Sequence, residues 1–295
     1  MAKNCYPVYV ISKGRYENCL TAKYFIEDKV DFKLVVEKQE ADEYKKRYGE
    51  NKVVILPFSN KGLGSYPARN WCWEDSIKNG YKRHWIFDDN IRGIFRLFKG
   101  VRIRANTNNA LRFVEDITDN YTNVAISGMN YSMFAGKWTT NSFVKNHHIY
   151  SNLLILNEIP YRWRLRYNED TDLNLQVLKG PEKYCLLYTN IFLINKMRTM
   201  VMKGGNTEEL YKGEGRLKMA KMLEKVHPDV VTTKWRFGRP QHVVNWNKFK
   251  QPLIKVAKPK KIDLNNYGKL VMINEVKSLS LRKLIDNSEQ TVRGK

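Results

Sequence analysis

The start of the chain alternates short apolar runs with stretches of helical character, and this alternation limits the possible folds more than any other feature. Each apolar run is bounded by turn-type residues and has the length of a buried strand. Strands and helices that alternate at this spacing favour a parallel α/β sheet with helices on both faces. The expected strands are 7–12, 32–36, 53–56 and 83–87, and the expected helices are 17–28, 41–48 and 67–78.

The pattern is looser after Asn90, and no internal repeat is present. A polar, aromatic and basic stretch without clear periodicity, 129–150, contains His147 and His148. From about Gln251 onward lysine and proline accumulate, which indicates a basic C-terminal extension at 251–295. In this half we expect helices at 106–121, 169–179 and 216–226, strands at 123–127, 151–157, 183–189, 191–194 and 229–233, and a loop at 204–215.

Charge is the strongest global signal. The 295 residues include 52 Lys and Arg against 30 Asp and Glu, a net charge of +22. Such an excess indicates a polyanionic partner, with nucleic acid as the first candidate. No apolar stretch reaches the roughly 18 residues that span a membrane, and the N-terminus lacks the apolar core of a signal peptide. The four scattered cysteines fit free thiols in a reducing cytoplasm, so we expect a cytoplasmic protein without membrane association.

The fourth expected strand ends in acids, in the order Trp85-Ile86-Phe87-Asp88-Asp89-Asn90. In open α/β sheets, ligands bind at the carboxyl ends of the strands. Two carboxylates and an amide placed there suit a hard divalent cation and the phosphates that it accompanies. The same residue types also form ordinary turns after strands, so the motif alone leaves both interpretations open.

Two further segments offer ligand-binding groups beside ordinary structural roles. Residues 61–70 are glycine-rich and place Arg69 in the first turn of a helix, where phosphate could bind. A plain connection with a solvated arginine is the alternative, and the segment is neither a Walker loop nor a dinucleotide fingerprint. Asn168 is a good N-cap for the helix that follows, but three acids in the next four residues exceed what capping requires. Either Glu169 or Asp170 could act as a general base toward a hydroxyl.

A late segment, 234–242, interleaves basic and aromatic residues, which suits contact with phosphates and stacking on bases. His242 ends it and could complete a metal site built on the acids. A single histidine is more often structural, and this alternative stays open.

Taken in order, these motifs resemble the GT-A nucleotide-sugar glycosyltransferases, with a mixed, mainly parallel sheet flanked by helices. The late sequence Trp-Arg-Phe-Gly-Arg-Pro-Gln-His makes the chain similar, more narrowly, to the TET-associated glycosyltransferases of bacteriophages. That family is associated with sugar transfer to 5-hydroxymethylcytosine in DNA. The resemblance covers roughly residues 7–246. It implies a glycosyltransferase domain at 1–250, divided into a nucleotide-sugar-binding half (1–128) and an acceptor-binding half (129–250).

The resemblance also implies roles for single residues. Nucleoside contacts would come from the ends of the first two strands, phosphate contacts from two arginines, and metal ligands from the acidic motif and the late histidine. The acceptor base would be Asp170, with Glu169 as the competing choice. The implied contacts are Arg15 and Glu37 for the nucleoside, Arg69 and Arg239 for the phosphates, Asp88 and Asn90 for the ribose and the metal, and His242 as the last metal ligand, with Ser12 and Asp89 as further donor-binding residues.

The resemblance implies a donor, by default UDP-glucose, a divalent metal such as Mn²⁺ or Mg²⁺, and DNA containing 5-hydroxymethylcytosine. The metal would neutralise the leaving diphosphate. The family pattern has an acid where this chain has Asn90, and an amide oxygen is a weaker ligand. The alternatives are a metal-dependent nuclease, a non-catalytic DNA-binding protein, and a GT-A transferase whose acceptor is protein or polysaccharide.

Overall fold

The computed structural model describes residues 5–197, Gly204 and 215–268. By its internal contacts the chain divides into two units, Met1–Ile262 and Asp263–Lys295. In the second unit the described residues are 263–268, where Leu264–Tyr267 forms a short 3-10 helix.

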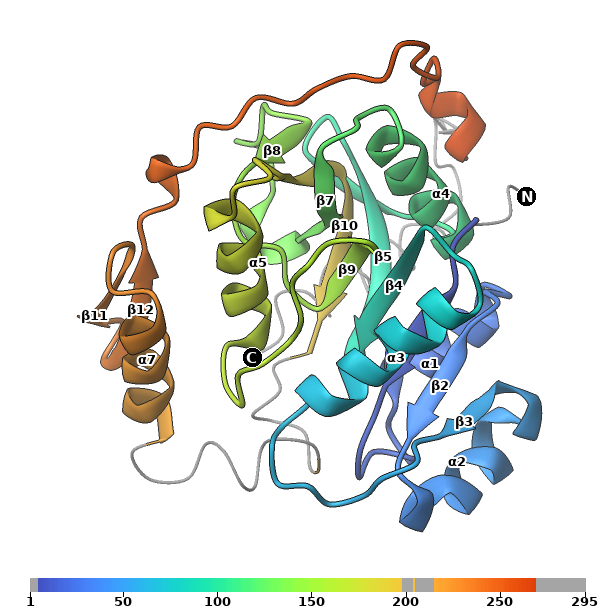
Figure 1. The fold of residues 1–295 in the computed structure, drawn as a ribbon. Coiled ribbons are helices and arrows are strands. Elements are labelled where there is room, and N and C mark those ends of the chain that lie inside the picture. Colours follow the sequence, from blue (N-terminus) through green and yellow to red (C-terminus); the bar gives the residue numbers. More distant parts are fainter. Residues whose placement is uncertain (1–4, 198–203, 205–214, 269–295) are drawn as a thin grey trace. The chain divides into compact units, whose positions relative to one another are not determined.

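The first half of the first unit forms the expected parallel sheet (Figure 1). Strand β1 pairs in parallel with β2 on one side and β4 on the other, and β2 pairs in parallel with β3. This confirms the predicted α/β class and places the carboxyl ends of β1, β2 and β4 at one edge. The elements are β1 (Val8–Ile11), α1 (Leu20–Glu27), β2 (Lys33–Val36), α2 (Ala41–Tyr48), β3 (Val53–Ile55), α3 (Tyr66–Lys78) and β4 (Arg83–Asp88).

The second half extends the same sheet with antiparallel pairs, so that the 10-stranded sheet is mixed. Its order is β3-β2-β1-β4-β9-β7-β10-β5-β6, and β8 pairs with β10. Strand β9 lies antiparallel between β4 and β7, whereas β7 and β10 are parallel. The elements are β5 (Ile91–Phe98), β6 (Val101–Arg104), α4 (Thr107–Thr118), β7 (Val124–Tyr131), β8 (Phe143–Lys145), β9 (Asn152–Leu156), α5 (Glu169–Lys179), β10 (Cys185–Lys196), α7 (Gly215–Val226), β11 (Val231–Arg236) and β12 (Arg239–Val244).

Helices cover both faces of the sheet, as the strand sequences require. Alternate residues of a strand point to opposite faces, and Ile86 of β4 packs in one cluster with Trp73 of α3 and Leu173 of α5. Its neighbour Phe87 points the other way and packs edge-on against Phe25 of α1, with ring centroids 5.1 Å apart. Both strand residues are fully buried. The continuous apolar run of β4 is therefore explained by burial on two sides.

Two hairpins were not predicted. Strands β5 and β6 meet at a two-residue turn, Lys99-Gly100, in which both residues have positive φ (47° and 79°), as a type I′ turn requires. Alternation of arginine with apolar residues on both sides of this turn was the signal in the sequence. Strand β12 was also missed, because its residues had been interpreted as a binding segment.

Other expectations can be compared directly with the structure. The two runs expected at 183–194 form one strand, β10, whose pairing with β7 shifts register between Thr189 and Leu193. Most of the expected loop at 204–215 lies outside the described residues. All four cysteines are free, as expected. No helix in the described part of the chain has both the length and the apolar character that crossing a membrane demands.

Candidate active site

A cavity of about 380 Å³ opens at the edge of the sheet where β1, β2 and β4 end. Its walls include the turn that follows each of these strands, together with the first turns of α3 and α5. Such an edge is the usual ligand site of an open α/β sheet. Ten of the eleven residues singled out in the sequence line it: Ser12, Arg15, Glu37, Arg69, Asp88, Asp89, Asn90, Glu169, Asp170 and His242.

Arg239 is the exception. It begins β12 and lies opposite Arg236, directly after the turn of the β11–β12 hairpin. His242, three residues further along the same strand, lines the cavity. At about 3.3 Å per residue this separates the two positions by roughly 10 Å. The hairpin therefore brings the histidine to the cavity and leaves the arginine exposed near its tip.

Asp88 is the centre of a dense polar network. Its Oδ1 accepts a hydrogen bond from Arg69 Nη2 at 2.8 Å, and its Oδ2 accepts one from Lys196 Nζ at 2.7 Å. The hydroxyl of Ser151 also donates to Oδ2, at 2.6 Å. Burial alone would raise the pKa of Asp88, but Lys196 and Arg69 hold it well below its usual range. The carboxylate is therefore ionised, and two cations share its charge.

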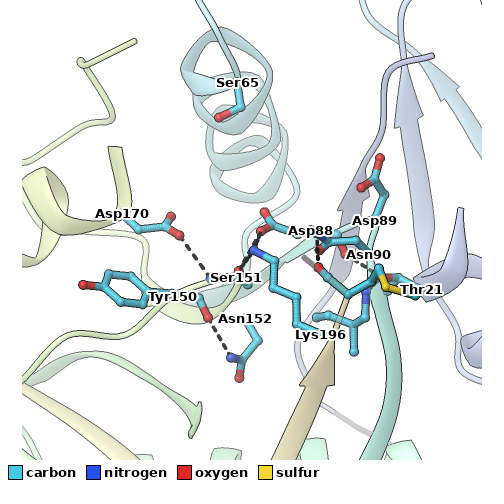
Figure 2. A network of polar contacts seen from close by, with 12 residues as sticks. Thr21, Ser65, Asp88, Asp89, Asn90, Tyr150, Ser151, Asn152, Asp170 and Lys196 are labelled. Atoms are coloured by element: carbon cyan, nitrogen blue, oxygen red, sulfur yellow. Dashed lines mark hydrogen bonds and ion pairs between the residues drawn. The ribbon is translucent and has the colours of Figure 1, made fainter. Parts of the chain in front are cut away.

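Ser151 connects Asp88 to Asp170 (Figure 2). Its N–H donates to Asp170 Oδ2 at 3.1 Å, and its carbonyl accepts from the N–H of Asp88 at 3.0 Å. The residue is 1% exposed and has a φ of 63°, in the left-handed region that non-glycine residues rarely adopt. This conformation, just before β9, lets one residue bind both carboxylates.

Asp170 has the properties of a general base. Burial raises its pKa to about 7; Arg69 opposes the shift, and the neighbouring carboxylates Glu169 and Asp88 add to it. A carboxylate with a pKa near neutrality can accept a proton and release it again at physiological pH. Asp170 Oδ1 lies 3.5 Å from Arg69 Nη1, and neither of these buried atoms has a hydrogen-bond partner in the described structure.

The other candidate base, Glu169, is held by a different set of contacts. Its Oε1 accepts a hydrogen bond from Ser65 Oγ at 2.6 Å, and Ser65 in turn accepts one from Arg69 Nε at 3.1 Å. Ser65 is the N-cap residue of α3, so Glu169 joins the starts of α3 and α5. These contacts hold the Glu169 carboxylate at the junction of the two helices.

Arg69 organises the acids instead of projecting into the cavity. Its side chain is 2% exposed and contacts Asp88, Glu169 and Asp170 at 2.8–3.5 Å. Its guanidinium also stacks over the ring of Trp163, with Cζ 4.6 Å from the centroid. A buried arginine that contacts three carboxylates reduces the repulsion between them, which allows them to lie close together.

The residues after β1 and β2 form a second part of the wall. Asp89 is ion-paired with Arg15 at 2.5 Å and accepts a hydrogen bond from Ser12 Oγ at 2.7 Å. Glu37 contacts Lys13 at 3.1 Å. Three apolar side chains that line the cavity, Ile11, Val35 and Leu56, lie next to these polar groups.

The glycine-rich connection before α3 has a structural function. Gly64 has a φ of +78°, and a Cβ atom there would lie 2.7 Å from the carbonyl oxygen of Arg166. Asn70 exchanges two hydrogen bonds with the backbone of Trp163. The connection thus packs against the segment before α5 and brings Arg69 to the acids.

The three acids that open α5 serve three different purposes. Asp172, the third of them, is completely buried and pairs with Arg164 at 2.9 Å and with His227 at 2.8 Å. It fixes α5 to the end of α7. Asn168 is the N-cap residue, as expected, but its side chain donates to the carbonyl of Met219 and accepts no hydrogen bond from the first turn of α5.

The predicted metal ligands do not fit a divalent ion in this arrangement. Asp88, Asn90 and His242 line one cavity, but both oxygens of Asp88 already contact cationic side chains. The amide nitrogen of Asn90 donates to the carbonyl of Met197 at 2.9 Å, which fixes its orientation. Across the described residues, no group of three or more His, Cys, Asp or Glu side chains is placed to hold a metal ion.

The sequence alone did not point to Lys196 or Ser151. Lys196 comes at the end of β10, more than 100 residues after Asp88, and is one of 52 basic residues. The available signal was that Lys196 is a charged residue at the end of a buried strand. The same signal identified Asp88 at the end of β4. Burial would lower the pKa of Lys196, but Asp88 holds it above its usual value, so the ammonium group stays charged.

The profile of one protein family matches this chain: that of the TET-associated glycosyltransferases, over residues 6–205. The match covers more than half of the chain. The chain belongs to this family. It is therefore a glycosyltransferase, which confirms the enzyme class expected from the resemblance and favours it over the nuclease and non-catalytic alternatives. No curated protein matches the sequence.

The region that matches the TET-associated glycosyltransferases contains Asp88, Ser151, Asp170 and Lys196. Membership also indicates a nucleotide-sugar donor. The β11–β12 hairpin follows the matched region, so the roles expected for Arg239 and His242 do not rest on the family match.

Proposed function

We propose that this TET-associated glycosyltransferase transfers a sugar from a nucleotide sugar, by default UDP-glucose, to the hydroxymethyl group of 5-hydroxymethylcytosine in DNA. The observation that supports this most directly is Asp170, a buried carboxylate with a pKa of about 7 on the wall of the cavity, tied through Ser151 to Asp88. A base of this kind suits an alcohol acceptor.

The cavity suits the donor. Its volume of about 380 Å³ lies within the range of ligand pockets, roughly 300–1,000 Å³. Ile11, Val35 and Leu56 would contact the flat nucleobase, while Glu37 and Lys13 offer an acceptor and a donor for its polar edge. The diphosphate would then lie toward Asp88 and its cations, and the sugar toward Asp170.

Two surface features support DNA as the acceptor. The net charge of +22 favours binding to a phosphate backbone. The tip of the β11–β12 hairpin is Phe237, which is 89% exposed and has a φ of 53°. An exposed aromatic residue in a left-handed turn position adds little to folding. The two-residue turn Phe237-Gly238 is flanked by Arg236 and Arg239. Such a tip could stack on a base while its arginines contact phosphates.

The target base flips out of the duplex into the cavity, because its hydroxymethyl group is inaccessible within the stack. The hydroxymethyl oxygen attacks the anomeric carbon in line and forms a new C–O bond, and its proton passes to the carboxylate of Asp170. The bond between the anomeric carbon and the diphosphate oxygen breaks, and the nucleoside diphosphate leaves with the electron pair.

A donor and acceptor panel tests this proposal. The full chain is incubated with each of several nucleotide sugars, UDP-glucose among them, and with DNA containing cytosine, 5-methylcytosine or 5-hydroxymethylcytosine. Digested nucleosides are then weighed by mass spectrometry. We expect a hexose mass gain on 5-hydroxymethylcytosine alone. Sugar transferred to protein or polysaccharide but to none of these DNAs would contradict the proposed acceptor.

A further inference from the structure

We propose that Lys196 occupies the place of a divalent metal at Asp88, so that an ammonium group of the chain itself neutralises the leaving diphosphate and transfer requires no metal. The inference concerns the donor side of the cavity and rests on the proposed function. Asp88 was expected to bind a metal, but its carboxylate contacts Arg69 and Lys196 instead.

Both oxygens of the Asp88 carboxylate are already occupied. Arg69 binds one oxygen at 2.8 Å, and Lys196 binds the other at 2.7 Å. Ser151 donates a further hydrogen bond to the second oxygen. A divalent ion on this carboxylate would lie within a few ångströms of two fixed positive charges, and repulsion at such distances is strong in a partly buried site.

The other carboxylate of the acidic motif, Asp89, is engaged elsewhere. The Asp89 carboxylate is ion-paired with Arg15 and accepts a hydrogen bond from Ser12. Asp89 is 5% exposed and Ser12 is 8% exposed. Of the two carboxylates in the acidic motif, Asp88 is the one that contacts Lys196 and Arg69. A metal would have to displace Lys196 to bind it.

Lys196 is placed to contact a ligand in the cavity. Its side chain lines the cavity and is 18% exposed. An ammonium group has three N–H donors. Contacts to Asp88 and to Ser151 Oγ use two of them, which leaves one for a phosphate oxygen. Figure 2 shows the side chain of Lys196 extending from its strand toward Asp88 and Ser151.

These contacts define what Lys196 does during transfer. As the bond between the anomeric carbon and the diphosphate oxygen breaks, negative charge grows on the diphosphate. A preorganised cation stabilises this charge without rearrangement. Lys196 keeps its proton throughout, and Asp88 holds its ammonium group in position. Lys196 thus acts as an electrostatic contact and exchanges no atoms with the substrate.

Metal binding by the full-length protein tests the proposal without any substrate. Mn²⁺ alone is titrated and followed by electron paramagnetic resonance. Wild type should bind Mn²⁺ at least 10-fold more weakly than Lys196→Ala, in which the removed ammonium group opens the Asp88 carboxylate. The double variant Lys196→Ala/Asp88→Asn should lose the new site. Lys13→Ala, which removes a different cation from the cavity wall, should bind like wild type. Micromolar binding of Mn²⁺ by wild type, or no gain in Lys196→Ala, would overturn the proposal.

Transfer from UDP-glucose to DNA containing 5-hydroxymethylcytosine provides the second measurement. Wild-type activity should change less than twofold in excess EDTA, and Lys196→Met should lose about 100-fold or more, the usual loss when one preorganised charge contact is removed. Lys196→Arg should retain more activity than Lys196→Met. Thermal melting of each variant shows whether it is folded. Loss of wild-type activity in EDTA, restored by Mn²⁺, would overturn the proposal. If no donor is consumed under any condition, the proposed function fails, while the Mn²⁺ titration still decides the role of Lys196.

Discussion

At the scale of single residues, the cavity separates two carboxylates by their surroundings. Asp88 contacts two cations and stays ionised, whereas Asp170 lies where burial outweighs the attraction of Arg69. Two acids with opposite pKa shifts in one site are typical of enzymes that need one permanent charge and one proton acceptor. This difference leads to two predictions.

The first prediction concerns the identity of the base. Asp170→Asn should lower the rate of transfer by about 100-fold to 10,000-fold, since an amide cannot accept the proton. Glu169→Gln is the matched control: because Glu169 is bound to Ser65 at the start of α3, its loss should cost much less. Steady-state kinetics on hydroxymethylated DNA measures both. A larger loss for Glu169→Gln would exchange the two roles.

The second prediction concerns pH. With a pKa of about 7 for Asp170, the rate of transfer should fall tenfold per pH unit below about pH 7. The folded protein holds the proton more tightly than the unfolded chain, so the contribution of Asp170 to stability is present at acidic pH and is lost as pH rises through 7. Asp170→Asn should therefore raise the melting temperature at pH 8 more than at pH 5. Equal shifts at both pH values would show that the pKa is not raised.

At the scale of elements, strand ends were predictable and their partners were not. The acids after β4 and the residues after β1 and β2 could be located, because parallel strands place their carboxyl ends at one edge. Ser151 directly precedes β9, which pairs antiparallel with β4, and Lys196 ends β10, which pairs in parallel with β7. Both pairings join residues at least 60 positions apart. Short-range sequence patterns carry no information about such pairing.

The connection between β3 and α3 gives a third prediction. Gly64→Ala should destabilise the protein by about 2–4 kcal/mol, because a side chain there has an unfavourable φ and meets the carbonyl oxygen of Arg166. Gly62→Ala is the control: its φ is also positive, but no atom lies within 4 Å of a Cβ there, so about 1 kcal/mol is expected. Denaturant unfolding measures the difference. Equal losses would show that the close approach to Arg166 contributes nothing.

The β11–β12 hairpin gives a fourth prediction. Asparagine is favoured at the left-handed position of the turn that Phe237 occupies. Phe237→Asn should therefore raise stability by a few tenths of a kcal/mol and weaken DNA binding about tenfold, the usual scale for losing one stacked base. Tyr81→Ala removes another exposed aromatic side chain, 42% exposed, and should leave DNA binding unchanged. Fluorescence anisotropy with a labelled duplex measures both. Unchanged binding in Phe237→Asn would remove the hairpin tip from the DNA contact.

At the scale of the whole molecule, charge and family membership support each other. Composition alone indicated a polyanionic partner, and the fold could be inferred from the order of strands and helices. The sugar, the nucleotide and the acceptor were not in the sequence pattern, because they depend on the shape of a cavity built by segments far apart in the chain.

Net charge gives the fifth prediction. If DNA binding depends on contacts with phosphates, the logarithm of the association constant should fall linearly with the logarithm of salt concentration, with a slope of several units. Transfer to 5-hydroxymethyl-2′-deoxycytidine, the free nucleoside, should depend much less on salt. Binding measured between about 50 and 200 mM salt tests this. A flat dependence for duplex DNA would indicate an acceptor that is not a polyanion.

Ser151 limits how this enzyme can change by mutation. One residue, in a strained conformation, binds Asp88 through its hydroxyl and its carbonyl and binds Asp170 through its N–H. A substitution that moves the backbone out of this conformation disturbs Asp170 and Asp88 together, so the two carboxylates are not adjusted separately there. New donor or acceptor preferences are therefore accessible through the apolar wall at Ile11, Val35 and Leu56 or through the hairpin, where single changes leave the spacing of the two acids intact.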